Sequence, residues 1–190
     1  MNRRKAIVGI LALTGIGIAS FGGFKYFYGN SKLNRGQLQN YLNLISELVD
    51  VIIPPTEIPG AKEAKVQDYI IDFMESCSSN KEYTNFFNGL NDLQVTCLRN
   101  YNTNFEDSTM EQKIAVLENL DGNSDPNSLL SKIDKKLRGR SFFTILKSLT
   151  IEGYCRSEVG ATQLLAYQPI PANYKAITKM ESNQKAWATN

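Results

Sequence analysis

The side chains that most often carry out catalysis are scarce in this chain. Among its 190 residues there is no histidine, which removes the commonest general base and the commonest metal ligand together. A serine or cysteine nucleophile therefore has no histidine partner, so triad chemistry is excluded. No glycine-rich phosphate loop follows a strand pattern. We expect no catalytic residue, no cofactor site and no metal site in this chain.

One group of carboxylates has spacing that could serve a cation. Asp68, Asp72 and Glu75 fall at i, i+4 and i+7, on one face of an expected helix. Acidic residues at this spacing are far more typical of a hydrated helix surface than of a metal site. The hydrated surface is the interpretation we favour.

The three cysteines leave two interpretations open. Cys77, Cys97 and Cys155 form no Cys-x-x-Cys pair, which excludes zinc-ribbon, thioredoxin-like and haem-attachment motifs. In an exported chain two of them could form a disulfide and leave one thiol free. Alternatively, all three are small buried apolar side chains.

Two segments are unusual for a simple helical protein. Residues 52–61 form a loop stiffened by Pro54, Pro55 and Pro59, and residues 153–174 combine tyrosines, an arginine and further prolines. Tyrosine and arginine are enriched at protein interfaces. The segments therefore predict a partner-facing surface with exposed apolar area, for which Tyr154, Ile170 and Tyr174 would be the anchors. The alternative is a tail that covers the helices, and both could hold.

The two segments lie between or after stretches of sequence that predict helices, so helices are expected to hold them in place. Apolar residues recur at three- and four-residue spacing, and no alternating strand pattern persists. We expect helices at about 34–52, 62–76, 81–101, 108–120 and 127–151, the fourth opened by a capping box of Ser108 and Glu111. The predicted fold is all-α: a single-domain, irregular helical bundle over residues 31–175, with an extended tail at 176–190.

The N-terminus has the layout of an export signal. A basic Asn-Arg-Arg-Lys head precedes an uncharged run from Ala6 to Phe24. The adjacent Arg3 and Arg4 indicate the twin-arginine route, which exports folded proteins, although they would also serve as positive-inside charge. Residues 1–30 are therefore predicted to be a signal or a membrane anchor, with cleavage and retention both open. The chain would be periplasmic.

The charge of the chain is unevenly distributed. Residues 1–35 carry six basic and no acidic residues, whereas the remainder carries 15 basic and 19 acidic ones. A mildly acidic body argues against a nucleic-acid partner, which calls for a basic face.

The two unusual segments carry a resemblance to a known family. The first reads Asp50-x-x-Ile53-Pro54-x-Thr56-x-x-Pro59-Gly60-Ala61, and the second reads Gly153-Tyr154-x-x-Ser157-Glu158-x-Gly160-Ala161, then Leu165-x-Tyr167-x-Pro169-x-Pro171-x-x-Tyr174. They resemble the opening and closing signatures of the gluconate 2-dehydrogenase subunit 3 family. Departures include Glu57, Ile58, Cys155, Arg156 and Ala172.

The resemblance implies a role beside an enzyme. Members of that family are non-catalytic accessory subunits of membrane-associated, periplasmic sugar or sugar-acid dehydrogenases. The large subunit, a flavoprotein of the glucose–methanol–choline type, carries FAD, and a cytochrome c subunit often takes the electrons. The small subunit aids export, maturation and stability of the large one. On this resemblance the partner-interface candidates are Pro54, Thr56, Pro59, Gly60, Tyr154, Ser157, Glu158, Gly160, Tyr167, Pro171 and Tyr174.

Two other classes of function remain as alternatives. One is a free-standing, membrane-tethered helical module that binds another protein. The other is an enzyme with an unrecognised carboxylate or tyrosine site, which would need a pocket of acids with shifted pKa values.

Overall fold

The computed structural model describes residues 35–122, 139–170, 177, 179–180 and 182–188. Contacts divide the chain into two units, Met1–Asn34 and Arg35–Asn190. The first unit lies outside the described residues, so the expected signal or anchor stays a prediction. The same holds for the expected helix between residues 127 and 138.

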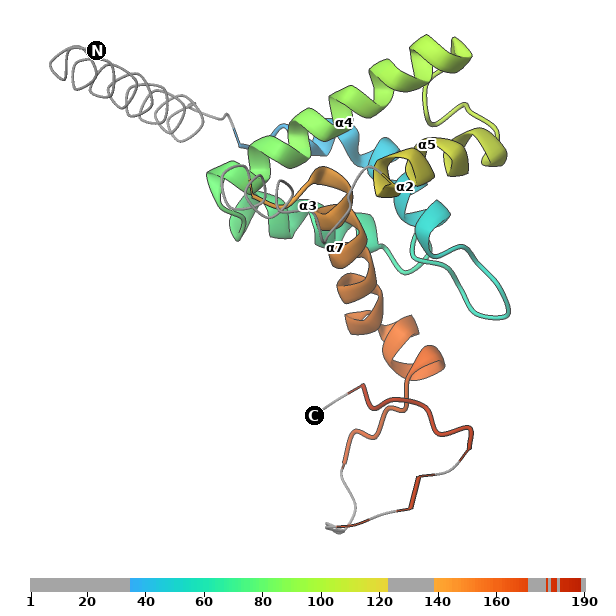
Figure 1. Ribbon diagram of the computed structural model, residues 1–190. Coiled ribbons are helices and arrows are strands. Elements are labelled where there is room, and N and C mark those ends of the chain that lie inside the picture. Colours follow the sequence, from blue (N-terminus) through green and yellow to red (C-terminus); the bar gives the residue numbers. More distant parts are fainter. Residues whose placement is uncertain (1–34, 123–138, 171–176, 178, 181, 189–190) are drawn as a thin grey trace, which may run out of the picture. The chain divides into compact units, whose positions relative to one another are not determined.

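The described part of the second unit is helical, as predicted. Its elements in chain order are η1 (Leu38–Tyr41), α2 (Leu42–Ile52), α3 (Val66–Ser76), α4 (Asn80–Tyr101), α5 (Met110–Gly122), α7 (Phe142–Arg156) and the π-helical turn η2 (Gly160–Leu164). Helix α7 packs against α3 and α4 and also touches α2 and α5 (Figure 1). Within the described ranges the strand geometry is limited to one isolated bridge, between Ala166 and Trp187.

The apolar stripes of the helices meet in one core. Its fully buried side chains include Leu44, Ile45 and Leu48 of α2, Ile70 and Met74 of α3, Phe86 and Leu90 of α4, and Ile145 and Leu146 of α7. Gly89 lies where α4 meets the start of α7, and a Cβ atom there would come within 2.2 Å of Phe142 Cγ. The glycine that weakens α4 by propensity therefore makes room for a core aromatic ring.

Three expected helix boundaries are wrong, and at two of them the local backbone conformation sets where the helix begins or ends. A continuous helix from 127 to 151 is interrupted at Gly139, whose φ is +88°, and α7 begins afresh behind the N-cap Ser141. Helix α3 begins at Val66 rather than 62 because Lys65 adopts a left-handed φ of 56°. Helix α7 also continues to Arg156, beyond the expected end at 151.

The predicted capping box of Ser108 and Glu111 is also wrong by one residue. Thr109 and Gln112 form it instead: the Thr109 N–H donates to Gln112 Oε1 at 3.0 Å, and the Gln112 N–H donates to Thr109 Oγ1 at 3.4 Å. Ser108 is buried and donates its hydroxyl to the Asn104 carbonyl at 2.8 Å. A capping box at the start of this helix is therefore confirmed, but Thr109 rather than Ser108 caps the helix because Ser108 is buried.

The first described residues are held in place by hydrogen bonds to the side chain of Glu75. This carboxylate accepts hydrogen bonds from the N–H groups of Gly36 and Leu38, at 2.7 and 3.2 Å, and from the Tyr83 hydroxyl at 3.1 Å. Burial, with Glu75 beside it, raises the pKa of Tyr83 to about 12, so the hydroxyl stays protonated. Arg35 donates to the Ser78 carbonyl at 2.7 Å. Glu75 thus fastens the first described residues to the end of α3.

The carboxylate face predicted on α3 is divided by the fold. Glu75 is used by the contacts above, whereas Asp68 and Asp72 are exposed to solvent. Across the described residues no group of histidines, cysteines and acids is placed to hold a metal ion.

A network of three charged side chains connects α2 to α5 and to the loop before α3. Glu47 accepts Lys113 Nζ at 2.7 Å on one oxygen and Lys62 Nζ at 2.6 Å on the other. Burial raises the pKa of Glu47, but the hydrogen bonds and charges of Lys113 and Lys62 outweigh it and hold the pKa below its ordinary value. Removing Glu47 would leave the buried Lys113 ammonium facing Lys62 without a counter-ion.

We expect Glu47→Gln to lower the free energy of unfolding by about 2 kcal/mol at neutral pH. Because the folded-state pKa of Glu47 is depressed, its contribution is present above the unfolded pKa and is lost as pH falls through the folded pKa. Urea unfolding between about pH 7 and pH 3 measures this. The difference in unfolding free energy between wild type and variant should shrink as pH falls through the folded-state pKa of Glu47. A difference that is constant across this range would contradict the ion-pair assignment.

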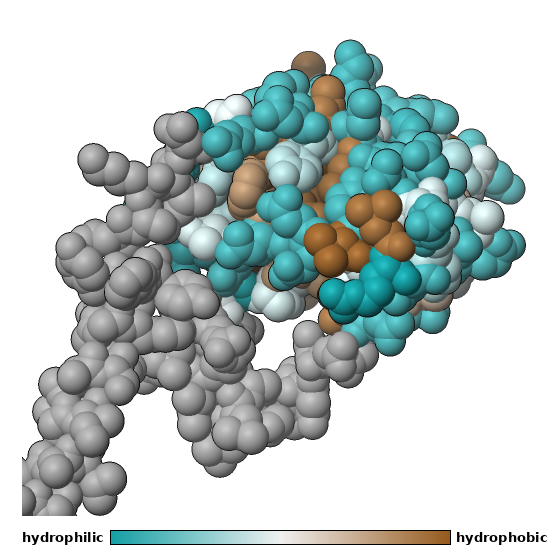
Figure 2. All heavy atoms as spheres, turned by 90° about the horizontal axis from the view of Figure 1, so that it is seen from above, coloured by the Kyte–Doolittle hydropathy of each residue, from teal (hydrophilic) through white to brown (hydrophobic). Residues whose placement is uncertain are grey.

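The surface of the helical body is mostly polar. On the face drawn in Figure 2, hydrophilic side chains dominate and apolar ones form small areas among them. Half-exposed apolar side chains on the helices include Val95, Leu98, Met110 and Ile114. Scattered apolar residues of this kind are ordinary for a protein surface. As far as the described residues go, no helix has the length and apolar character needed to cross a membrane.

Candidate interaction site

The first unusual segment is a closed loop between α2 and α3. The Ala61 N–H donates to the Ile53 carbonyl at 2.9 Å, which brings the two ends of the loop together. Its tip, Pro54 to Glu57, is exposed, whereas Gly60 and Ala61 are buried at its base. The loop therefore presents Pro54 and Thr56 to solvent on a rigid support.

Gly60 is required for this closure. A Cβ atom at Gly60 would lie 2.7 Å from the Pro55 nitrogen and 2.9 Å from the Ile53 carbonyl oxygen. Both neighbours are backbone atoms, which cannot move aside as a flexible side chain could. Gly60 is thus explained by loop closure rather than by contact with a partner.

One hydrogen bond joins the two unusual segments, although they are far apart in sequence. The Tyr154 hydroxyl donates to the Pro59 carbonyl at 2.7 Å across a separation of 95 residues. Tyr154 is 2% exposed, and burial raises the pKa of its hydroxyl. The expectation that Tyr154 anchors an exposed apolar surface is therefore wrong. Its ring belongs to the core, and its hydroxyl binds the backbone near the base of the loop.

The turn after α7 depends on Ser157. The Ser157 N–H donates to the carbonyls of Gly153 and Tyr154, at 3.0 and 3.1 Å, which ends the helix. The Ser157 hydroxyl donates to the Tyr154 carbonyl at 2.7 Å and accepts the Gly160 N–H at 3.0 Å. One side chain therefore closes α7 and opens η2.

Two further glycines of the second segment lie at close approaches. A Cβ atom at Gly160 would come within 1.8 Å of the Tyr154 carbonyl oxygen. A Cβ atom at Gly153 would lie 2.6 Å from Tyr69 Cδ1 and 3.0 Å from Val66 Cγ1, where α7 crosses α3. Both positions admit only glycine without a shift of their neighbours.

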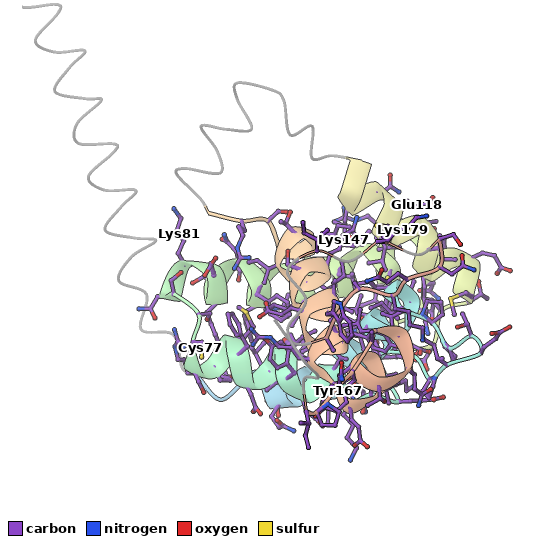
Figure 3. The ribbon with its side chains drawn as sticks, turned by 90° about the horizontal axis from the view of Figure 1, so that it is seen from below. Cys77, Lys81, Glu118, Lys147, Tyr167 and Lys179 are labelled. Atoms are coloured by element: carbon purple, nitrogen blue, oxygen red, sulfur yellow. The ribbon has the colours of Figure 1, made fainter. Side chains whose placement is uncertain are left out.

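The eleven predicted interface residues thus separate into three groups. Tyr154 joins the two segments through the carbonyl of Pro59. Gly60 allows the first segment to close on itself, and Ser157 and Gly160 shape the turn within the second. Pro54, Thr56, Glu158 and Tyr167 are exposed and available to a partner, Tyr167 at 49% (Figure 3). Pro171 and Tyr174 lie outside the described residues.

The exposed apolar area is further along the chain than expected. Ile170 is 81% exposed, which confirms its predicted exposure. Ile177, Met180 and Trp187 were not singled out in the sequence, yet they are 93%, 80% and 54% exposed. The signal that could have revealed them is a set of large apolar residues in a tail that lacks helical periodicity.

The three cysteines are all free thiols in the structure, and only one of them is buried. Cys97 is buried, Cys155 is partly buried, and Cys77 is exposed after the end of α3 (Figure 3). Burial raises the pKa of the Cys97 thiol, as does the charge of Glu106. Burial as a small apolar side chain therefore holds for Cys97 but not for Cys77.

Comparison with known protein families identifies the group to which these segments belong. The family model described as gluconate 2-dehydrogenase subunit 3 matches residues 39–172. This range includes the first segment, the second segment as far as residue 172, and every described helix from α2 to η2. The chain belongs to this family. The resemblance carried by the two signature segments is thereby confirmed. A search of the curated proteins finds no match to the chain, and a search of the solved structures finds none either.

Family membership gives the coarse role of the chain. The family is named as one subunit of a dehydrogenase, so the chain is an accessory subunit of such a complex. Such a subunit associates with the other parts of a dehydrogenase complex. The match ends at residue 172, before Ile177, Met180 and Trp187.

Proposed function

We propose that this subunit binds a periplasmic flavoprotein dehydrogenase of the glucose–methanol–choline type and aids its export, maturation and stability. FAD and the oxidation of a sugar or sugar acid belong to the partner. The observation that carries the proposal is the family match over residues 39–172. It covers the first signature segment and the second as far as residue 172, and the Tyr154–Pro59 hydrogen bond joins the two.

The contacts of the described body support a binding role. Groups with shifted pKa values include Glu47, Tyr83 and Tyr154, and each is engaged in holding the fold: Glu47 with two lysines, Tyr83 with Glu75, Tyr154 with Pro59. Shifted pKa values often mark catalytic sites, but structural contacts of this kind produce them as well. The rigid, exposed loop tip at Pro54 and Thr56 suits recognition of a protein surface.

In this proposal the N-terminal segment is the export signal of the complex. Arg3 and Arg4 direct the chain to the twin-arginine route, and the folded flavoprotein is exported with it as a passenger. Residues 1–30 also attach the complex to the membrane if they are retained. A cytochrome c subunit completes the complex by taking electrons from the flavoprotein.

Affinity purification of the full-length chain from its native envelope tests the proposal. We expect a flavoprotein in about equal amount, recognised by its flavin absorbance and by mass spectrometry. We also expect the level of that flavoprotein to fall in cells that lack this chain. Matched cells carrying an unrelated tagged envelope protein are the control. Recovery of the chain alone, without flavin, would contradict the proposal and favour a free-standing, membrane-tethered module.

A further inference from the structure

The chain after η2 forms an arm, which we define as residues 165–170, 177, 179–180 and 182–188. It follows the C-terminal end of α7 and the η2 turn (Figure 1). Residues 167–170 lie outside any helix or strand. Most of the arm lies beyond residue 172, where the match to the family model ends.

The two ends of the arm are fixed to each other. The Ala166 N–H donates to the Ala186 carbonyl at 2.8 Å, and the Ala188 N–H donates to the Ala166 carbonyl at 2.9 Å. Lys185 Nζ donates to the Gln163 carbonyl at 2.5 Å, which ties the returning end to η2. The arm therefore has a defined base on the helical body, and its conformational freedom is already restricted before any partner binds.

Large apolar side chains on the arm point into solvent. Ile177, Ile170 and Met180 are exposed by 80% or more, and Trp187 and Tyr167 by about half. By contrast, the exposed apolar residues on the helices reach at most 51%, at Val95. A gathering of large apolar side chains with such exposure marks an interaction site, because exposing each one to water costs about 1.5–3 kcal/mol relative to full burial.

The backbone of the arm favours a protein partner over a bilayer. An extended segment keeps unpaired N–H and C=O groups, which cannot be buried in hydrocarbon without a large cost. Segments that lie in the bilayer interface are amphipathic helices, whereas the described residues of the arm are not helical. A groove on a folded protein can pair such a backbone and cover alternate side chains.

Charge indicates the character of that groove. Residues 165–190 carry Lys175, Lys179 and Lys185 against the single acid Glu181, whereas residues 35–164 carry 13 basic and 18 acidic residues. Of these, Lys179 and Lys185 belong to the arm, so the arm is basic whereas residues 35–164 are acidic. Apolar side chains with interspersed lysines complement an apolar groove edged by carboxylates.

We propose that the arm is the docking element of this subunit and lies in an apolar, carboxylate-edged groove of the flavoprotein subunit. The inference rests on the proposed function and extends it, since it assigns the binding to residues beyond the family match. The exposed tip at Pro54 and Thr56 would then be a secondary contact.

The test compares two variants of the full-length chain in the purified complex. Ile170→Asp with Ile177→Asp places charges on the arm, and Val95→Asp is the matched control on the exposed side of α4. We expect the double variant to bind the flavoprotein at least about tenfold more weakly, while the control binds like wild type. Thermal unfolding of each chain alone should match wild type, because all three side chains are exposed.

The possible outcomes separate the two proposals. Wild type that brings down no flavoprotein overturns the proposed function and the arm proposal with it. Wild type and double variant that bind the flavoprotein equally overturn the arm proposal alone, as does loss of binding in Val95→Asp only. Should the double variant fail to fold, hydrogen exchange on the wild-type complex decides: protection of arm amides supports the proposal, and unchanged exchange overturns it.

Trp187 distinguishes a protein groove from a membrane. It is the only tryptophan of the chain, so the fluorescence of the chain alone reports on the arm. With vesicles of phosphatidylethanolamine and phosphatidylglycerol, we expect the emission of Trp187 to stay unchanged. A blue shift that the Ile170→Asp, Ile177→Asp variant abolishes would overturn the protein groove in favour of a lipid surface.

Discussion

Replacing Gly160 by alanine is expected to lower the free energy of unfolding by about 3 kcal/mol. The new Cβ atom would lie 1.8 Å from the Tyr154 carbonyl oxygen, so the backbone of η2 or of α7 must move. That carbonyl also accepts the Ser157 hydroxyl, and the Ser157 hydroxyl in turn accepts the Gly160 N–H. A shift therefore disturbs the whole turn that leads from α7 into the arm. Thermal unfolding should show a loss of about 6–12 °C.

Gly36→Ala is the matched control for this prediction. Gly36 has a φ of +95°, but nothing lies within 4 Å of the position its Cβ would take. Its substitution adds backbone strain without a collision and should cost about 1 kcal/mol. If Gly160→Ala were as stable as Gly36→Ala, the close approach at η2 would not be a constraint on the fold.

Replacing both Arg3 and Arg4 by lysine is expected to abolish export of the partner. The substitution keeps the positive charge that any secretory signal needs, but removes the paired guanidinium groups that define the twin-arginine signal. Flavoprotein activity should therefore move from the periplasmic and membrane fractions to the cytoplasm. Cell fractionation followed by a dye-linked dehydrogenase assay measures the change.

Lys5→Arg is the control for export, since it alters a neighbouring cation without touching the arginine pair. Export should continue in that variant. Normal export in the Arg3→Lys, Arg4→Lys variant would show that the pair acts only as positive charge and that the chain uses a different route. The binding of the flavoprotein to the chain could still be intact in that case.

The structure changes the meaning of the signature segments. Read as sequence, Gly60, Tyr154, Ser157 and Gly160 are candidates for partner contact. In the fold Tyr154 holds the loop at 53–61 against the end of α7, and Gly60 lets that loop close. Ser157 and Gly160 set the direction in which the chain leaves the body. These residues therefore position binding surfaces rather than form them, and the exposed residues Pro54, Thr56, Glu158 and Tyr167 remain for direct contact.

Local patterns in the sequence were sufficient for the helices and for the family. Apolar spacing predicted α2, α3, α4 and α5, because a stripe at helical period must face a core wherever the chain folds. Boundaries were predicted less well, since one residue decides each of them. Thr109 caps α5 in place of Ser108 because Ser108 is buried, and Gly139 interrupts the expected last helix because it adopts a positive φ.

Apolar spacing, the two signature segments and the lack of histidine were enough to identify an all-α member of the subunit 3 family without histidine chemistry. Which signature residues are buried and which are exposed depends on tertiary contacts. The bond between Tyr154 and Pro59 spans 95 residues, and no local pattern encodes such a contact. Likewise, Ile177 and Met180 are exposed because no described part of the chain packs over them. The spacing of apolar residues predicts where a helix lies along the chain. The burial of a side chain depends on residues that are distant in sequence and meet only in the folded protein.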